Sequence, residues 1–365
     1  MRLLVISLAN YKTNGISSVI KNLYLSEAFA NTKITFLLPD QSDPDRIREL
    51  EGHGHTVILR PDRIKKMPQY MALIRKIVKQ NGIQIVHVHG NSRTSVIELL
   101  AAKQAKCSVR IAHGHNTGTK SLLLHRMLTP LFNCVCTDRM ACGQAAGEFM
   151  HGKHPFAVVN NGIRLQDFLF NSEARQTIRE KYGLQDRIVI GHVGYFTVVK
   201  NQAFLVDILQ KLHETDKRYC LLLIGDGDLQ RTVREKAAAL GLEQDVIFAG
   251  TTNQVAAYLS AFDLVGMPSL NEGLPVTLIE QQASGLHCVV ADSITREVDK
   301  TGNLTFLPLE AGAQVWADAI LQLVLPKDRK TFSAEAAERI RVCGYDVATE
   351  AEKLMASYQQ MIGEK

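Results

Sequence analysis

The feature that most constrains the fold of this chain is a regular alternation of short β-rich runs with helical patterns, which occurs in both halves. The β-rich runs of the first half are residues 2–8, 33–39, 55–60, 83–89, 109–115 and 156–162. Those of the second half are residues 186–194, 218–227, 245–250, 262–269 and 286–292. Such alternation is typical of parallel sheets covered by helices on both faces. The sequence therefore predicts an α/β protein with two doubly wound, Rossmann-like domains.

A polar segment with one glycine, NNGIRLQDFLFN (160–171), separates the two series and is interpreted as a hinge loop. We expect an N-terminal domain over 1–165, a second domain over 166–345, and a last helix within 346–365 that packs back on the first domain. A length of 365 residues fits two domains of ordinary size. Ligands of such sheets bind outside the carboxyl ends of the strands. Two such domains facing each other would form a central cleft.

The segment MPSLNEGLPVTLIEQQASGLHCVVAD (267–292) carries the strongest chemical signal. It predicts a strand to Ser269, a loop, and a helix that begins at Pro275, a residue favoured at a first helical position. Free amides of Gly273, Leu274 and the first helical turn would then suit a diphosphate. Glu272 and Glu280 lie eight residues apart and can face one cavity, where carboxylates accept hydrogen bonds from sugar hydroxyls.

NEGLPVTLIE resembles the E-x7-E signature of glycosyltransferase family 4, the retaining group with the GT-B fold. The resemblance extends through most of the chain. It includes TNGISSVIKNL (13–23), VHVHGN (86–91), RIAHGHNTG (110–118), ACGQAAGEFMHG (141–152), IGHVGYFTVVKNQ (190–202) and LLLIGDGDL (221–229). In this order and spacing these stretches are similar to bacterial exopolysaccharide and capsule glycosyltransferases.

The resemblance implies roles for individual residues. Glu280 would hydrogen-bond the ribose, whereas Glu272 and the amides of Gly273 and Leu274 would hold the transferred sugar and its phosphate. Lys200 would neutralise the diphosphate as the glycosidic bond breaks. The donor-binding set also contains residues of three loops, namely Gly15, Gly194, Tyr195, Asn201 and Pro275. His115, at the end of its strand, would line the acceptor side and contact the sugar.

Two positions depart from the family pattern, and the milder departure is Asn14, where relatives commonly have a Gly-Gly pair. Relatives usually have Gly-Arg before the lysine, whereas this chain has Gly194-Tyr195. A tyrosine donates one hydrogen bond but carries no charge at neutral pH. The change removes a cation from the diphosphate site, which raises the alternative that the chain is a catalytically weakened nucleotide-sugar-binding subunit.

The histidine pairs His87/His89 and His113/His115 each share a strand face, an arrangement that metals can use. No nearby carboxylate completes a ligand set, and the family resemblance implies metal-independent chemistry without a cofactor. We therefore expect no bound metal. The seven cysteines lack paired C-x2-C spacings and are interpreted as reduced thiols.

Positive charge is concentrated in the first half. Residues 1–170 hold 22 basic and 11 acidic side chains, and the stretch 60–82 alone has seven basic residues and one acidic. In its helical part a basic stripe lies beside an apolar one, which is consistent with a solvated helix or with docking on anionic lipid. Nucleic acid is disfavoured because no aromatic residues are interleaved. No run approaches a membrane span, and no signal-peptide pattern is present, so we expect a cytoplasmic protein that is peripheral on the inner face of the membrane.

The family resemblance, together with the two-domain pattern, predicts a retaining glycosyltransferase that transfers a hexosyl unit from a nucleotide-sugar, which we expect to be a UDP-sugar. The acceptor would be a lipid-linked or oligosaccharide molecule in the assembly of exopolysaccharide or capsule. The N-terminal domain would bind the acceptor and the second domain the donor. We expect front-side attack assisted by the departing phosphate, with Glu272 as a covalent nucleophile as the minor alternative. A sugar-nucleotide epimerase of the same fold is the other competing enzyme class.

Overall fold

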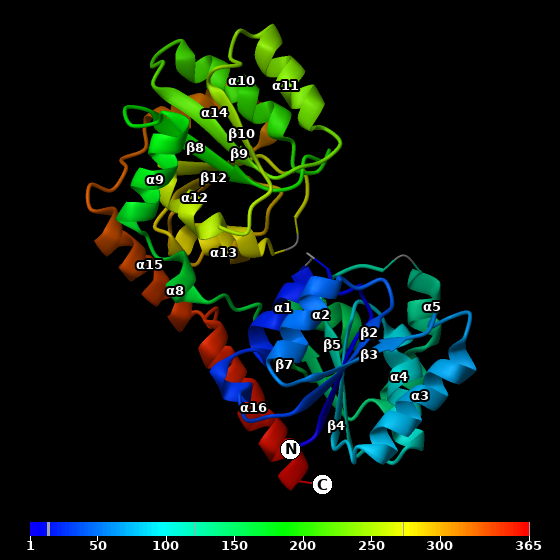
Figure 1. Ribbon diagram of the computed structural model, residues 1–365. Helices are drawn as coiled ribbons and strands as arrows, with labels where there is room; N and C mark the ends of the chain where they lie inside the picture. The colour runs from blue at the N-terminus through cyan, green and yellow to red at the C-terminus, as the bar shows by residue number, and fades with distance from the viewer. Residues whose placement is uncertain (13–14, 120, 273, 365) are drawn as a thin grey trace. The chain divides into compact units, whose positions relative to one another are not determined.

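The computed structural model describes residues 1–12, 15–119, 121–272 and 274–364 (Figure 1). It divides into two compact units. Unit 1 is Met1–Gly162 with Gly344–Lys365, and unit 2 is Ile163–Cys343. The chain thus passes between units at Gly162 and Cys343, within three residues of the boundaries expected at 165 and 345.

Unit 1 is built on a parallel sheet in the order β3-β2-β1-β4-β5-β6-β7. The strands are β1 (Leu3–Ser7), β2 (Ile34–Pro39), β3 (Thr56–Arg60), β4 (Ile85–Gly90), β5 (Val109–Gly114), β6 (Asp138–Ala141) and β7 (Ala157–Val158). The strand order reverses between β1 and β4, so the loops that leave these two strands diverge and open a crevice at their carboxyl ends.

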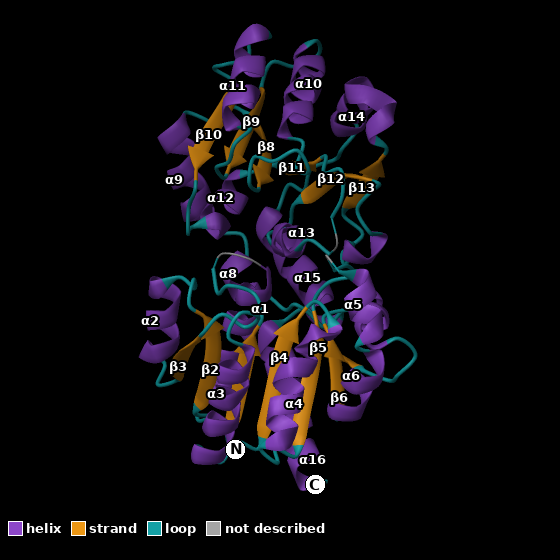
Figure 2. Cartoon of the chain, turned by 90° about the vertical axis from the view of Figure 1, so that its right-hand side faces the viewer, coloured by secondary structure: helices purple, strands orange, loops and turns teal. Residues whose placement is uncertain are grey.

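Helices cover both faces of this sheet because successive residues of its strands point to opposite sides. Leu3 and Val5 pack with Tyr24, Phe29 and Tyr358, which lie on α1 (Gly15–Tyr24), η1 (Glu27–Phe29) and α16 (Val347–Gly363). Leu4 and Ile6 pack instead against α3 (Met67–Gln80), α4 (Val96–Gln104) and α6 (Thr129–Val135). Figure 2 shows α3 and α4 in front of the sheet. The remaining helices of the unit are α2 (Pro44–Gly52), η2 (Arg93–Ser95), α5 (Leu122–Met127) and α7 (Gln144–His151).

The expected terminal helix is α16. It contacts α1 and η1, so the last helix packs on the first unit although it follows the whole of unit 2 in the chain. Its buried side chains include Leu354 and Tyr358, which join the same core as β1.

Unit 2 is built on a second parallel sheet in the order β10-β9-β8-β11-β12-β13. The strands are β8 (Ile188–Val193), β9 (Tyr219–Ile224), β10 (Val246–Gly250), β11 (Leu264–Met267), β12 (His287–Ala291) and β13 (Leu304–Leu307). The helices are α8 (Leu165–Phe168), α9 (Ser172–Tyr182), α10 (Gln202–His213), α11 (Gln230–Ala239), α12 (Val255–Ala261), α13 (Val276–Ala283), η3 (Arg296–Val298), η4 (Leu309–Ala311), α14 (Gly312–Leu321) and α15 (Arg329–Val342). A core around Trp316 joins α10 and α14 to one face of the sheet.

The strand order of unit 2 reverses between β8 and β11, which places its crevice at the loops after these two strands. The helix expected to begin at Pro275 begins one residue later, since Pro275 has extended backbone angles and is the N-cap of α13. The expected fold class of two doubly wound parallel-sheet domains is confirmed by both sheets.

Candidate active site

The predicted donor residues of unit 2 lie on the two loops that flank its strand reversal. Gly194 and Tyr195 follow β8, whereas Glu272 lies five residues beyond the end of β11. The two loops are joined by hydrogen bonds, because Leu270 N donates to Val199 O (2.8 Å) and Asn201 Nδ2 donates to Pro268 O (3.2 Å). The fold therefore brings residues 194–201 and 268–272 together although the sequence separates them by about 70 residues.

Lys200 and Glu272 form an ion pair across these loops, with 2.6 Å between Lys200 Nζ and Glu272 Oε1. Their side chains are only 20% and 17% exposed. The pair is therefore screened less than a surface ion pair, and its attraction is correspondingly stronger. Glu272 is fixed from the other side too, since its backbone forms a β-bridge with Ile294 just beyond β12. An ammonium held this way can exchange a carboxylate oxygen for a phosphate oxygen.

Glu280 lies on α13 in an environment that disfavours its charge. Burial raises the pKa of this carboxyl from 4.5 to about 7, although part of the side chain still reaches solvent. Among the described residues, none forms an ion pair or a side-chain hydrogen bond with it. A carboxylate that is desolvated without a cation partner destabilises the fold, and such groups are characteristic of binding and catalytic sites.

The loop after β8 is packed closely by a Gly-Asp-Gly turn after β9. A Cβ atom at Gly225, whose φ is +136°, would lie 2.1 Å from the carbonyl oxygen of Gly194. Phe196 N donates to Asp226 O (2.9 Å), and a Cβ at Gly227 would meet Phe196 O at 2.7 Å. Gly225 and Gly227 are therefore both required for the shape of the loop after β8 (residues 194–201), which is the candidate binding site for the diphosphate. The sequence analysis assigned these two glycines no role beyond the family pattern. The G-x-G spacing directly after a strand could have indicated that they pack against a neighbouring loop.

His192 is a second residue that sequence reasoning missed. It is buried on β8, its Nδ1 lies 2.9 Å from Gly266 O, and a Cβ at Gly194 would lie 3.3 Å from its Nε2. Burial, and then the charge of Lys200, lower the pKa of His192 to about 4, so its ring is neutral at pH 7. Nε2 has no hydrogen-bond partner within the described part of the chain. A neutral polar atom thus lies beside Gly194 and close to Lys200.

The other predicted donor residues have mixed surroundings. Tyr195 is 56% exposed, and its carbonyl accepts a hydrogen bond from Gln202 Nε2 (2.9 Å). Asn201 has a left-handed backbone (φ 52°) and is the N-cap of α10, with its amide nitrogen already bonded to Pro268 O. Leu274 is partly buried and Pro275 buried. Gly273 lies outside the described residues.

In unit 1, Gly15 is the first residue of α1, and a Cβ there would meet no described heavy atom within 4 Å. His115 follows β5 directly and is partly exposed. Its Nε2 lies 2.8 Å from His89 Nδ1, and burial lowers the pKa of His115 to about 3. The ring is therefore neutral at physiological pH, and its Nδ1 is buried without a hydrogen-bond partner among the described residues.

His115 belongs to a buried network of four histidines and two tyrosines. His87 Nε2 lies 3.1 Å from His113 Nδ1, which forms a second pair beside that of His89 and His115. The Tyr24 hydroxyl joins the pairs, since it lies 3.1 Å from His87 Nδ1 and 3.0 Å from His89 Nε2. The Tyr358 hydroxyl of α16 lies 2.9 Å from that of Tyr24 and also hydrogen-bonds His87.

This network keeps its histidines neutral. Burial lowers the pKa values of His87, His89 and His113 well below their usual range, and the neighbouring rings lower them further. A neutral imidazole has one donor and one acceptor nitrogen, so in each pair the tautomer of one ring determines that of the other. The hydrogen-bonding character of His115 Nδ1 is thus coupled through Tyr24 to residues deep in unit 1.

Three of these rings, His87, His89 and His113, have nitrogens within 4.8 Å of one another, a separation that a metal could use. Two features favour the hydrogen-bonded network instead. The point on which His87 Nδ1 and His89 Nε2 converge is already occupied by the Tyr24 hydroxyl, at 3.1 and 3.0 Å. Their nitrogens are also engaged with Tyr24, His113 and His115.

Comparison with known proteins decides the family. The family description "Glycosyl transferases group 1" matches residues 187–325, a range that contains every unit 2 residue of the candidate site. EpsF of Bacillus subtilis (strain 168), which is named as a glycosyltransferase, is 32% identical over 96% of this chain and 94% of its own length. The chain is a group 1 glycosyltransferase. The predicted family and enzyme class are thereby confirmed.

Two further relatives of this glycosyltransferase are informative. The UDP-Gal:alpha-D-GlcNAc-diphosphoundecaprenol alpha-1,3-galactosyltransferase of Escherichia coli is 27% identical over 63% of this chain and 62% of that protein. The crystal structure of Anabaena Alr3699/HepE in complex with UDP superposes with a TM-score of 0.81 at 18% identity, over 99% of this chain and all of that one. At this identity the superposition establishes a shared fold.

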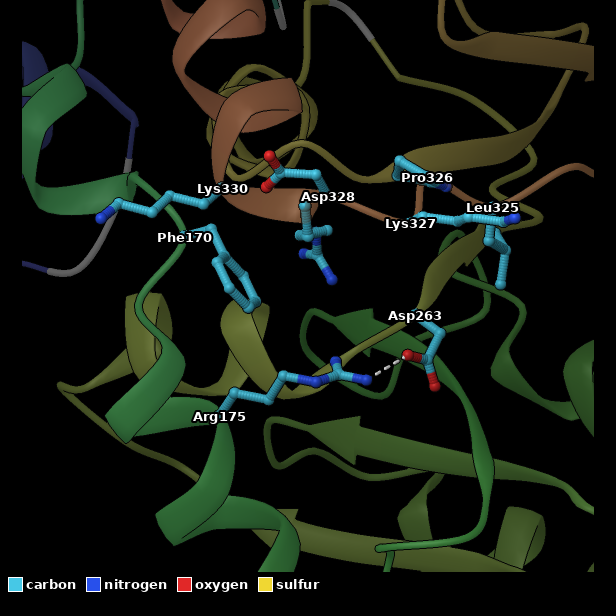
Figure 3. A pocket seen from close by; sticks show the side chains of 9 residues that line it. Phe170, Arg175, Asp263, Leu325, Pro326, Lys327, Asp328 and Lys330 are labelled. Atoms are coloured by element: carbon cyan, nitrogen blue, oxygen red, sulfur yellow. Dashed lines mark hydrogen bonds and ion pairs between the residues drawn. The ribbon is translucent and has the colours of Figure 1, made fainter.

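A pocket in unit 2 of the glycosyltransferase lies away from these loops. It is a cavity of about 290 Å³ beside Asp263, which precedes β11, whereas Glu272 follows that strand (Figure 3). Arg175 and Arg179 pair with Asp263 at 2.6 and 3.1 Å, and Arg329 donates to carbonyl oxygens at the end of α12. These arginines satisfy the carbonyl ends of α12 and join α9, α12 and α15, which is a structural role.

No helix within the described ranges is both long and apolar enough to cross a bilayer.

Proposed function

We propose that this glycosyltransferase transfers a hexosyl unit, with retention of anomeric configuration, from a UDP-sugar to a lipid-linked or oligosaccharide acceptor in surface polysaccharide assembly, such as exopolysaccharide or capsule. The UDP complex of HepE and the UDP-Gal and diphosphoundecaprenol in the name of the E. coli relative support this assignment. Within it, unit 2 binds the donor and unit 1 the acceptor.

The observation that carries the proposal is the Lys200–Glu272 pair on the reversal loops, followed in sequence by α13 with its desolvated Glu280. Glu280 accepts hydrogen bonds from the ribose hydroxyls, because no described residue of the protein donates one to its side chain. Lys200 contacts the diphosphate, and Glu272 turns to the hydroxyls of the sugar together with the amides of Gly273 and Leu274. Gly194, Tyr195 and Asn201 form the loop wall beside the phosphates, with Pro275 fixing the start of α13.

In this mechanism the bond between the anomeric carbon and the β-phosphate oxygen breaks as the acceptor hydroxyl attacks from the same face. The departing UDP takes up the acceptor proton, and Lys200 stabilises its developing negative charge. His115 contributes a neutral ring nitrogen to a sugar hydroxyl, and Gly15 leaves space for the donor at the start of α1. Lys200 offsets part of the charge on the diphosphate, and we propose that the reaction needs neither a metal nor a cofactor.

A donor screen with product analysis tests this proposal. The purified protein is incubated with UDP- and GDP-sugars, with and without undecaprenyl-diphosphate-linked GlcNAc, and products are identified by mass spectrometry and NMR. We expect UDP and one glycosylated lipid, with the donor's α configuration retained. An isomerised sugar nucleotide formed without acceptor would indicate an epimerase. Tight UDP binding without any transfer would indicate a weakened binding subunit.

Contact with anionic membrane through residues 60–82 is part of this proposal, because a lipid-linked acceptor is presented at a membrane. On α3 the apolar stripe is buried in the core of unit 1, including Ile74, Ile77 and Val78. Lys76 and Lys79 remain exposed, whereas Arg75 hydrogen-bonds Gln104. This helix therefore supplies electrostatic attraction and no apolar anchor, and replacing Arg75, Lys76 and Lys79 with Glu should weaken vesicle binding at low salt only.

A further inference from the structure

An uncovered apolar surface lies on the hairpin formed by α5 and α6 in unit 1. Five large apolar side chains within ten residues are exposed by 42–73%, and we call them the α5–α6 face: Leu122, Leu123, Leu124, Met127 and Leu131. Scattered exposed apolar residues are ordinary, but a contiguous group of this size marks an interaction surface.

The opposite side of the same hairpin is firmly anchored. Phe132 and Val135 are buried in the core that lies under α3 and α4. His125 is 2% exposed, its ring stacks on Phe149 at 4.6 Å, and its Nδ1 accepts a hydrogen bond from Arg93 N at 3.3 Å. The exposed leucines therefore belong to a fixed helix with one face in the core and the other uncovered.

A second exposed apolar position adjoins this face. Ile64, in the loop before α3, is 66% exposed. Its neighbour Arg63 pairs with Glu98 (Nε–Oε1, 2.5 Å) and donates to the carbonyl of Thr94 in η2. Because α5 contacts η2 as well, the Ile64 loop and the α5–α6 face are both attached to this short helix. Figure 1 shows α3, α4 and α5 on the same side of unit 1.

The charge around this surface is mainly positive, although Asp62, whose Oδ1 accepts a hydrogen bond from Ile64 N, is exposed there too. No Asp or Glu occurs over residues 99–137, a stretch of 39 residues that contains five Lys or Arg. Arg126 is exposed on α5 itself, and Lys65 and Lys66 are exposed beside Ile64. Apolar side chains flanked by an excess of cations match the interface of an anionic bilayer, where acyl chains lie beneath negative headgroups.

We propose that the α5–α6 face and Ile64 insert into the headgroup region of an anionic membrane and hold the enzyme on its surface. A second copy of this chain fits less well, because two such surfaces meeting face to face would oppose like charges. The helices are far too short to span a bilayer, so the enzyme lies on the membrane. The apolar anchor thus lies on α5, α6 and the Ile64 loop, apart from the basic stripe of α3.

The location suits a membrane-bound acceptor. Leu122 is seven residues beyond His115, so the docking surface begins close in sequence to the proposed acceptor side of the site. The idea that docking brings the enzyme to a membrane-bound acceptor rests on the proposed function, but vesicle binding itself does not. It is therefore measured without donor or acceptor, so that failure of either proposal can be recognised separately.

The test is co-sedimentation of the full chain with vesicles of phosphatidylcholine alone or with 30% phosphatidylglycerol. The variant is Leu123→Ser/Met127→Ser, which removes the two most exposed side chains of the α5–α6 face. We expect the partition coefficient for the anionic vesicles to fall at least tenfold, since burying each such side chain contributes roughly tenfold or more. The control is Val324→Ser/Val342→Ser, which removes two exposed valines of unit 2 (94% and 79%) and should change nothing.

Calorimetric UDP affinity and thermal unfolding of each variant report whether the fold and the donor site are intact. The proposal is overturned if the wild type does not bind anionic vesicles, or if the double serine variant binds them as well as the control does. It is also overturned if sedimentation velocity shows a concentration-dependent dimer that the double variant abolishes, because the face would then be a contact between copies. Loss of binding only in the α3 triple glutamate variant would assign docking to α3 alone.

Discussion

Replacing Glu280 by glutamine should make the protein more stable and its nucleotide affinity lower. The pKa of this carboxyl is raised from 4.5 to about 7 by burial. Between these two pH values the folded protein keeps the proton that the unfolded chain has released. The free energy of unfolding therefore falls as pH rises from 4.5 to 7, and it stays at the lower level above pH 7.

The gap between the two pKa values corresponds to an upper limit of about 3 kcal/mol at pH 8. Because part of the side chain reaches solvent, we expect Glu280→Gln to raise the free energy of unfolding by about 1–3 kcal/mol at pH 8. At pH 4.5 the two proteins should be nearly equally stable, since folded Glu280 is then protonated and the unfolded chain has released only half of this proton.

Nucleotide binding should respond in the opposite direction. Hydrogen bonds to a charged acceptor contribute about 1.5–3 kcal/mol, so Glu280→Gln should weaken UDP binding at pH 8 by roughly tenfold or more. Uridine affinity should fall by the same factor, since the ribose is the contact. The wild type should lose UDP affinity as pH falls below 7 and Glu280 takes up its proton.

Urea unfolding at pH 4.5 and 8, with calorimetric titration of UDP and uridine, measures both effects. Glu243→Gln is the matched control, because Glu243 is an exposed glutamate of the same unit. Unchanged stability at pH 8 together with unchanged UDP affinity would refute the reasoning. A gain in stability with unchanged affinity would leave Glu280 desolvated but remove it from the ribose site.

Three further predictions follow from particular contacts. Tyr195→Arg should tighten UDP binding about tenfold by adding a second cation beside the diphosphate, because the other candidate cation, Arg164, is paired with Asp167 (3.1 Å). If Tyr195→Arg leaves UDP affinity unchanged and Arg164→Ala strongly reduces it, Arg164 is the second cation instead. Asp263→Asn should lower the free energy of unfolding by about 3–5 kcal/mol in urea, because the buried Arg179 and the half-buried Arg175 lose their charged partner. A loss below 1 kcal/mol would contradict this. Below pH 6.5 the histidines of the unfolded chain take up protons, whereas the buried histidines of unit 1 stay neutral. The free energy of unfolding should therefore decrease by about 1.4 kcal/mol for each such ring and each unit by which the pH falls. A urea midpoint that does not change from pH 6.5 to 5 would argue against neutral rings.

Much of this architecture could be predicted from sequence because parallel strands are buried on both faces and read as continuous apolar runs. Residues 2–8 became β1 and 218–227 contain β9. The pair of glutamates could also be predicted from the sequence, since Glu272 lies on a loop and Glu280 on the helix that follows it. Local patterns of this kind need only short-range information.

Contacts between distant loops could not be predicted in the same way. The ion pair of Lys200 and Glu272 depends on β8 and β11 being neighbours, although β9 and β10 lie between them in sequence. The packing of Gly225 against Gly194 depends on the adjacency of β8 and β9. The sequence pattern indicated which residues follow strands. The order of the strands in the sheet decides which of these residues contact one another.

The histidine network has a related explanation. The H-x-H spacing indicated that His87 and His89 share a face, but the link to Tyr358 comes from a helix 271 residues away from His87. Residues 121–135 lie outside the strands predicted from the sequence. The structure forms two short helices there and leaves their outer side chains exposed.

The central claim, that Lys200 serves the leaving diphosphate in a UDP-sugar-dependent transferase, is tested most directly by measuring UDP release from the donor identified in the screen. The comparison is made with and without lipid-linked acceptor, for wild type, Lys200→Arg and Lys200→Met. We predict acceptor-dependent release by the wild type, partial activity for Lys200→Arg, and a loss of at least a hundredfold for Lys200→Met, with thermal unfolding reporting the cost of leaving Glu272 unpaired. Acceptor-dependent release by a folded Lys200→Met at the wild-type rate would contradict the account.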